Sequence, residues 1–117
     1  MAGSTVLVVD DEPAIRLLCR VNLELDGHRV LEAGTLDEGR KALAQTPQLV
    51  LLDLHVAGED GLDLLTEIRA DQPEIKVVLL TGTTEITDEH QELADGVLTK
   101  PFTLEQLGST VSRLASV

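Results

Sequence analysis

The sequence has few aromatic and few basic residues, and each shortage excludes a class of function. Phe102 is the only aromatic residue, so stacking platforms for bases or sugars are not expected. Nine Lys and Arg residues stand against 21 Asp and Glu residues, and the formal net charge of −12 argues against direct binding to nucleic acid or to an anionic membrane. No apolar stretch is long enough to span a bilayer. Most of the acidic side chains are expected to form a solvated surface.

Cysteine is equally scarce, since Cys19 is the only one. It cannot form an internal disulfide, and a reducing, cytoplasmic location is the natural expectation. It lies in a helical pattern, where we expect it to fill the core or its boundary. The first residues of the chain lack the basic and apolar regions of a signal peptide, so none is expected here. Residues 1–4 are set aside as an N-terminal tail or as residues added to the natural chain, and residues 5–117 are expected to form one domain.

What the chain does contain is a regular alternation of short apolar runs and helical patterns. Three runs are continuous and strongly apolar, which is typical of strands buried on both faces. Two weaker runs predict strands nearer the edges of a sheet. The strong runs are Thr5–Val9, Leu49–Leu52 and Lys76–Leu80, and the weaker ones are His28–Ala33 and Gly96–Thr99.

Helical patterns occupy the segments between these runs. The first begins at Pro13 and ends at Asp26-Gly27. Its helical spacing is carried by an apolar stripe of Ala14, Leu17, Leu18, Val21 and Leu25. Three further helices have N-terminal caps, namely Thr35 with Glu38, Asp60 alone, and Thr103 with Gln106. The third helix carries Leu64, Leu65 and Ile68, and the last one Leu104, Leu107, Val111 and Leu114. Residues 83–95 are poor in apolar side chains and predict a short, exposed and mobile helix.

This order predicts a single α/β domain of the (βα)₅ type, a doubly wound parallel sheet with helices on both faces. In such sheets, ligands bind beyond the carboxyl ends of the strands. Polar residues stand at four of these ends: Asp10-Asp11, Asp53, Thr81-Gly82 and Lys100. Crowded carboxylates repel one another, and a hard divalent cation such as Mg²⁺ (or Mn²⁺) relieves the repulsion through oxygen ligands. The pattern therefore predicts a metal and phosphoryl site.

The chemistry of this cluster suggests a role for each group. An aspartate can act as a nucleophile toward phosphorus, and Asp53 is the best placed to do so because it ends the central strand of the set. Asp10 and Asp11 are better suited to hold the metal. Lys100, the Thr81 hydroxyl and the Gly82 N–H would neutralise and position a phosphoryl group.

These residues resemble the conserved motifs of the receiver, or response-regulator, family of two-component signalling. The opening strand with its paired aspartates, the Leu-Leu-Asp-Leu around Asp53, the pair Thr81-Gly82 and the run Thr99–Phe102 occur in the family's order and span nearly the whole chain. The resemblance implies a flavodoxin-like strand order of 2-1-3-4-5. It also implies a phosphoryl donor, either a sensor histidine kinase or a histidine phosphotransfer protein, and a downstream protein effector.

The resemblance also implies finer roles. Asp11, Asp53 and the backbone carbonyl of His55 would hold Mg²⁺ directly, and Asp10 would act largely through water. Asp53 would be the phosphoacceptor, with the Lys100–Pro101 bond in the cis form. Thr81 would turn toward the phosphorylated Asp53 as part of a switch. His55 is expected to contact the phosphoryl region and to control the access of water.

Three departures from the family pattern bear on this expectation. Ala57 stands where the family often has Pro, which predicts a looser loop. Val97 stands where the family usually has Tyr or Phe, so an aromatic rotamer switch is excluded at this switch position. Only 19 positions separate Thr81 from Lys100, which predicts a shortened fourth helix and gives a resemblance to receivers attached to hybrid sensor kinases.

Two alternatives stay open at the level of the sequence. A pseudo-receiver would bind protein partners without phosphorylation, and Val97 motivates that hypothesis. A metal-dependent phosphatase with an aspartyl nucleophile would be a true enzyme, but the second Asp that such enzymes place two residues after the nucleophile is His55 here. The main hypothesis is a phosphoacceptor domain that assists its own phosphorylation and dephosphorylation without being an enzyme. A zinc site at His28, His55 and His90 is not expected, because they belong to unlike elements.

Overall fold

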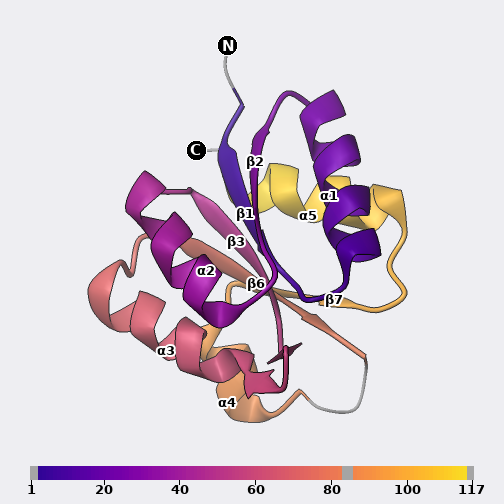
Figure 1. Cartoon of the computed structure of the whole chain (residues 1–117). Coiled ribbons are helices and arrows are strands. Elements are labelled where there is room, and N and C mark those ends of the chain that lie inside the picture. The colour runs from indigo at the N-terminus through magenta and orange to yellow at the C-terminus, as the bar shows by residue number, and fades with distance from the viewer. Residues whose placement is uncertain (1–2, 83–85, 116–117) are drawn as a thin grey trace.

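Five parallel strands form the central sheet of the computed structural model, which describes residues 3–82 and 86–115 (Figure 1). These strands are β1 (Thr5–Val9), β2 (Arg29–Ala33), β3 (Leu49–Asp53), β6 (Lys76–Thr81) and β7 (Gly96–Thr99). They lie in the order β2-β1-β3-β6-β7, and every neighbouring pair is parallel. The doubly wound fold and its strand order are therefore confirmed, with the two weaker strands at the edges.

Helices cover both faces of the sheet, as Figure 1 shows. On one face lie α1 (Pro13–Leu25) and α5 (Leu104–Ala115). On the other lie α2 (Leu36–Ala42), α3 (Gly61–Asp71) and α4 (Asp88–Leu93), with a 3₁₀ turn at Leu43–Gln45 after α2. Each face has its own aliphatic core, and β1 and β3 contribute fully buried side chains to both cores. Each fully buried Leu or Val contributes about 2 kcal/mol to folding, so the core needs no aromatic residues.

Helix α1 is present as predicted, and much of the apolar stripe that indicated it lies outside the core. Cys19 and Leu23 are fully buried against the sheet, whereas Leu17, Val21 and Leu25 are 59%, 48% and 79% exposed. The helix is apolar on two faces, and tertiary packing buries the face that carries Cys19 and Leu23. Burial raises the pKa of the Cys19 thiol to about 12, which agrees with the expected role of Cys19 as core filler.

The predicted helix caps are largely confirmed. The Asp60 side chain accepts a hydrogen bond from the Leu62 N–H at 2.9 Å. Thr103 and Gln106 form a complete capping box at α5, in which each side chain accepts the backbone N–H of the other residue. At α2 the box is only half formed. Thr35 accepts the Glu38 N–H, but the Glu38 carboxylate accepts from the Gly34 N–H instead of from Thr35.

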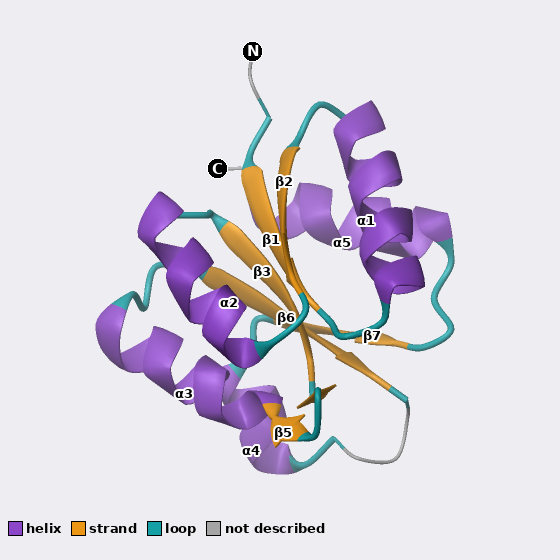
Figure 2. Cartoon of the chain, viewed as in Figure 1, coloured by secondary structure: helices purple, strands orange, loops and turns teal. Residues whose placement is uncertain are grey.

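Two small elements complete the fold, a hairpin that was not predicted and a short fourth helix that was. A small antiparallel hairpin, β4 (His55–Val56) with β5 (Glu59–Asp60), follows the end of β3 (Figure 2). The fourth helix has only six residues, which confirms that it is short, and none of them is buried. Its N-terminus is closed by a capping box between Thr87 and His90, in which the imidazole Nδ1 accepts the Thr87 N–H. The predicted segment begins at residue 83, and residues 83–85 lie outside the described structure.

Candidate functional site

The three predicted carboxylates converge at the carboxyl ends of β1 and β3. These strands pair in parallel with Val9 opposite Leu52, so the residues that follow them lie side by side. Asp10, Asp11 and Asp53 each offer one carboxylate oxygen, and these oxygens all lie within 4.8 Å of one another. Such a set of hard oxygen donors fits a divalent cation of the Mg²⁺ class.

Lys100 connects the cluster from the end of β7. Its Nζ atom donates hydrogen bonds of 2.9 Å to both Asp10 Oδ2 and Asp53 Oδ2, and one of 3.2 Å to Glu12 Oε1. The bond between Lys100 and Pro101 is cis, as the family resemblance implied. One ammonium group thus faces three carboxylates, which leaves the site with an excess of negative charge.

The buried position of this charge cluster shifts the ionisation of its members. Burial raises the pKa of Asp10, and this effect exceeds the opposing hydrogen bonds from the Glu12 N–H and from Lys100. Burial by itself lowers the pKa of Lys100, but its hydrogen bonds to Asp10 and Asp53 and their negative charges outweigh that effect, so the pKa is raised. Lys100 therefore carries its positive charge throughout the physiological pH range.

Thr81 and Gly82 end β6 beside the acidic cluster. Thr81 pairs with Thr99 of β7 and its carbonyl accepts the Lys100 N–H at 2.6 Å. The Thr81 hydroxyl is buried and has no hydrogen-bond partner within the described part of the chain. A buried hydroxyl without a partner costs about 1–3 kcal/mol, so this donor is suited to a group that binds at the strand ends.

The hairpin β4–β5 holds the loop that follows Asp53. The His55 N–H donates to Asp53 Oδ1 at 3.1 Å, which orients the second oxygen of that carboxylate toward Lys100. At the tip, the Ala57 N–H donates to Asp11 Oδ2 at 3.1 Å. The hairpin gives this loop a defined geometry, and its looseness relative to loops with Pro stays a prediction.

Sequence reasoning left out three contributors to the site. Glu12 is the third carboxylate on Lys100, and the consecutive acids after β1 were the available signal for it. The Ala57 contact is made by the backbone, so no side-chain pattern could reveal it. Gly61 packs so closely under the end of β3 that a Cβ there would overlap the carbonyl oxygen of Asp53.

The two other histidines accept hydrogen bonds from backbone N–H groups. The Nδ1 atom of His28 accepts the Ser4 N–H, and His90 caps α4. The switch position Val97 is 37% exposed on β7. Its neighbour Leu98 belongs to the core beneath α1 and α5, so alternation along the strand turns Val97 toward the opposite face.

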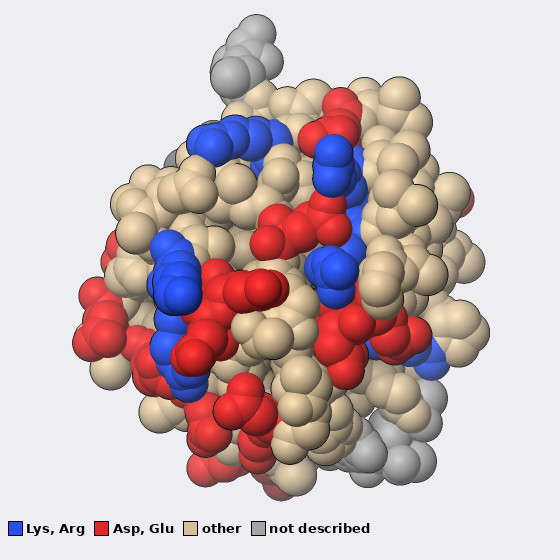
Figure 3. All heavy atoms as spheres, in the orientation of Figure 1, with Lys and Arg blue, Asp and Glu red and all other residues tan. Residues whose placement is uncertain are grey.

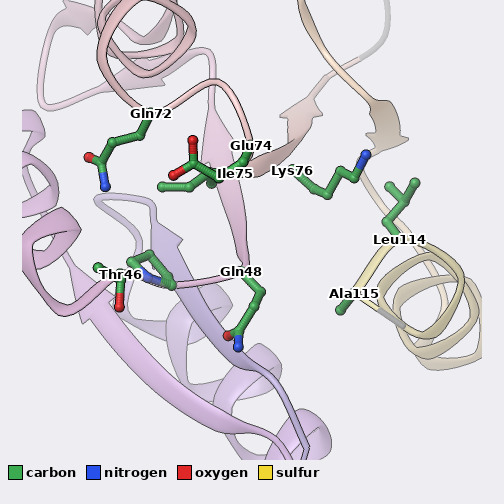
Figure 4. Close-up of a pocket in the computed structure, with 9 residues that line it drawn as sticks. Thr46, Gln48, Gln72, Glu74, Ile75, Lys76, Leu114 and Ala115 are labelled. Carbon is green, nitrogen blue, oxygen red and sulfur yellow. The ribbon is translucent and has the colours of Figure 1, made fainter. Parts of the chain in front are cut away.

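A separate hollow of about 230 Å³ lies at the amino ends of β3 and β6, beside the end of α5 (Figure 4). Its lining amides are already engaged, because Gln48 Oε1 accepts the Thr5 N–H and Gln72 Nε2 donates to the Leu43 carbonyl. The hollow is at the edge of the sheet opposite the acidic cluster. It is therefore not part of the same site.

The distribution of charged side chains on the surface agrees with the acidic composition. Figure 3 shows Asp and Glu side chains gathered on the side of the molecule that carries α2, α3 and α4. On this face the Lys and Arg side chains lie among the acidic ones and form no continuous basic patch. Within the described residues, no helix combines the length and the apolar character needed to cross a bilayer.

Comparison with known proteins agrees with this arrangement. The model of the response regulator receiver domain matches residues 6–112. The phosphate regulon transcriptional regulatory protein PhoB of Pseudomonas aeruginosa is 35% identical over 123 residues, covering 100% of this chain and 52% of that protein. KdpE of Escherichia coli, a KDP operon transcriptional regulatory protein, is 38% identical over 108 residues, covering 89% of this chain and 48% of that protein. The chain therefore spans about half the length of the curated relatives it matches.

Solved structures give the same result. The receiver domain of NtrX from Brucella abortus superposes with a TM-score of 0.89 at 34% identity, covering 96% of this chain and 98% of that one. The response regulator protein TrrA from Thermotoga maritima, solved in complex with Mg(2+)-BeF, superposes with a TM-score of 0.86 at 33% identity, covering 95% and 98%. Fold and site together define a receiver domain of two-component signalling. The chain belongs to the response regulator receiver family.

Proposed function

We propose that this chain works as a phosphoacceptor switch in which Asp53 takes a phosphoryl group from a phosphohistidine on a sensor kinase or a phosphotransfer protein. The observation that carries the proposal is the placement of Lys100 between the carboxylates of Asp10 and Asp53, next to the exposed Asp11. A cation bound by Asp10, Asp11 and Asp53, with the His55 carbonyl, would neutralise the phosphoryl oxygens. Mg²⁺ fits these donors best, and Mn²⁺ would fit them as well.

The chain's own groups divide the work of transfer. An oxygen of the Asp53 carboxylate attacks phosphorus while the P–N bond to the donor imidazole breaks. The Lys100 ammonium then pairs with a phosphoryl oxygen, and the Thr81 hydroxyl and the Gly82 N–H donate to the others. Because the Thr81 hydroxyl lacks a partner within the described chain, its movement toward phosphorylated Asp53 would satisfy a buried donor. That gain would bias the end of β6 and the neighbouring α4 toward a second arrangement.

The exposed apolar stripe of α1 is the surface that we assign to the phosphoryl donor. Leu17 and Val21 are exposed on a helix that begins three residues after Asp10. A second apolar hollow, lined by Ile15, Leu18 and Phe102, lies between α1 and the Lys100–Pro101 segment. Together they form a helix-docking surface beside the acceptor.

Other parts of the signalling role are proposed from charge and chemistry. The net charge of −12 and the lack of a basic patch on the face in Figure 3 favour an output carried by protein contacts, with no direct nucleic-acid binding by this part of the chain. The buried thiol and the kinase partner favour a cytoplasmic location. We also propose that the domain assists its own phosphorylation and dephosphorylation without turnover of an external substrate, and His55, exposed beside Asp53, would control the access of water.

The experiment is intact-mass measurement after incubation with a small phosphodonor, with and without Mg²⁺. We expect the wild type to gain the mass of one phosphoryl group only with Mg²⁺, and Asp53→Asn to gain nothing. A pseudo-receiver would show no gain and would bind its partner equally as wild type and as Asp53→Asn. A phosphatase would instead release phosphate steadily from a generic phosphate ester.

A further inference from the structure

The turn of the β4–β5 hairpin has an unusual backbone at its first residue. Ala57 has a φ of 52° and Gly58 has a φ of 81°, so both residues of this two-residue turn are left-handed. That geometry is the one that tight hairpins favour, and Gly adopts it freely. Ala adopts it at a cost of about 1 kcal/mol. A strained Ala indicates that the surroundings hold the turn in place.

The hairpin is held at both ends by the core and the acceptor. Val56 is fully buried in the core beneath α2 and α3, and His55 donates its N–H to the Asp53 carboxylate. On the other strand, Asp60 caps α3. The position of the turn relative to the sheet is therefore fixed by contacts that do not involve Asp11.

The contact that the turn makes is with Asp11. The Ala57 N–H donates to Asp11 Oδ2, although the two residues are 46 positions apart. Asp11 is exposed, so without this bond its carboxylate would rotate freely in solvent. A hydrogen bond from Ala57 restricts the rotamer of this carboxylate, and one of its oxygens lies within 4.8 Å of oxygens of Asp10 and Asp53.

We propose that the backbone N–H of Ala57 is a positioning group that holds Asp11 ready to bind the cation. This inference rests on the proposed function, because it concerns the same metal site. It gives a physical meaning to the absence of the Pro that the family often carries here. Pro has no N–H and a φ near −65°, so it could neither make this bond nor adopt this turn. In this chain, replacing Ala57 by the Pro that the family often has should weaken cation binding at the site.

The test is calorimetric titration of the whole chain with Mg²⁺. Ala57→Pro should weaken binding about three- to tenfold, as expected from loss of one ordinary hydrogen bond at an exposed position. Ala57→Gly keeps the N–H and relieves the strain, so it should bind at least as tightly as the wild type. Because Pro could distort the whole loop, a third variant replaces only the amide of Ala57 by a backbone ester. The ester should weaken binding like Pro, with an unchanged circular dichroism spectrum.

A second readout needs no metal. Without Mg²⁺, the Ala57 amide should be protected from hydrogen exchange in the wild type and lose that protection in Asp11→Ala. If the ester variant binds Mg²⁺ as tightly as the wild type, or if the amide exchanges equally in both proteins, the positioning role is wrong while the phosphoacceptor function stands. If the wild type takes up no Mg²⁺, the proposed function fails, and the exchange measurement alone still decides whether Ala57 fixes Asp11.

Discussion

Gly61 affects both the packing of α3 and the position of Asp53. It starts α3 directly beneath the end of β3, and its N–H donates to the Leu54 carbonyl at 2.7 Å. A side chain here would push against the backbone of Asp53, so the position of the acceptor depends on the absence of a Cβ.

We predict that Gly61→Ala lowers the free energy of unfolding by about 1–3 kcal/mol, the usual cost of overpacking. It should also lower the yield of phosphorylated Asp53, because the strand end moves. Urea unfolding followed by circular dichroism measures the first effect. Gly82→Ala is the control for stability, since an added Cβ there meets nothing within 4 Å among the residues that the structure describes. Equal stability of Gly61→Ala and the wild type would show that the contact is not tight.

The chemistry of single residues was predictable wherever it depended on side chains at strand ends. Asp10, Asp53 and Lys100 were expected to meet because parallel strands end at one edge, and Lys100 lies within hydrogen-bonding distance of both carboxylates. Their chemical roles stay predictions. The Ala57 contact was not predictable, because it uses a backbone N–H and a positive φ. Neither feature is indicated by the residue types in the sequence, apart from the neighbouring Gly58.

At the scale of elements, α1 shows what periodicity can and cannot determine. Its spacing predicted the helix correctly, including Pro13 at the first position. It did not identify the buried face, because apolar residues occur on two sides and only tertiary packing selects between them. The exposed side is the surface assigned to the phosphoryl donor.

We predict that Leu17→Ser and Val21→Ser slow phosphoryl transfer from a phosphohistidine protein by about tenfold or more, as expected for anchors of a small interface. Phosphorylation by a small-molecule donor should be unchanged, because Asp53 and Lys100 are intact. Time courses with both donors make the comparison. Ala44→Ser, at an exposed position in the turn after α2 on the other face of the sheet, is the matched control. A slowing with both donors would place the defect in the site instead of in docking.

An ion pair links α2 and α3. Arg40 donates to Glu67 at 2.8–3.1 Å, and this hydrogen bond lowers the pKa of Glu67 below its ordinary value of 4.5. A lowered pKa stabilises the fold above the ordinary value, and the contribution is lost as the pH falls through the lowered value. Both partners are partly exposed, so the contribution is small.

We predict that Glu67→Gln lowers the melting temperature slightly near neutral pH and that the difference vanishes in acid. Thermal unfolding of both proteins across the acid range measures it. Glu74→Gln, at another exposed glutamate, should not reproduce the effect. A difference between wild type and Glu67→Gln that persists or grows at the lowest pH would have the wrong sign for this linkage.

At the scale of the whole molecule, the overall topology was the property that the sequence predicted best. Uninterrupted apolar runs alternate with capped helices, and the rules of parallel sheets then leave few topologies. What could not be read at this level were the small antiparallel hairpin and the cap at His90, since both arise from local turns of two to four residues. The acidic charge of −12 is the other global property, and it makes the folded chain sensitive to cations.

We predict that Mg²⁺ raises the stability of the whole domain by mass action, because only the folded chain assembles the three carboxylates. At a hundredfold excess over the dissociation constant the gain is about 2.7 kcal/mol. Thermal unfolding in Mg²⁺ and in NaCl of matched ionic strength separates specific binding from screening. Asp11→Asn should lose most of the difference between the two salts. An equal effect of both salts on the wild type would mean that no cation site forms.

The most direct measurement is a crystal structure of this chain with Mg²⁺ and beryllofluoride, an analogue of the phosphoryl group. The proposed site requires one metal ion between the carboxylates of Asp11 and Asp53. It also requires the beryllofluoride to be bound to Asp53, within reach of Lys100 and Thr81. Crystals grown under these conditions with no ion at the cluster, or with the beryllofluoride bound elsewhere, would contradict it.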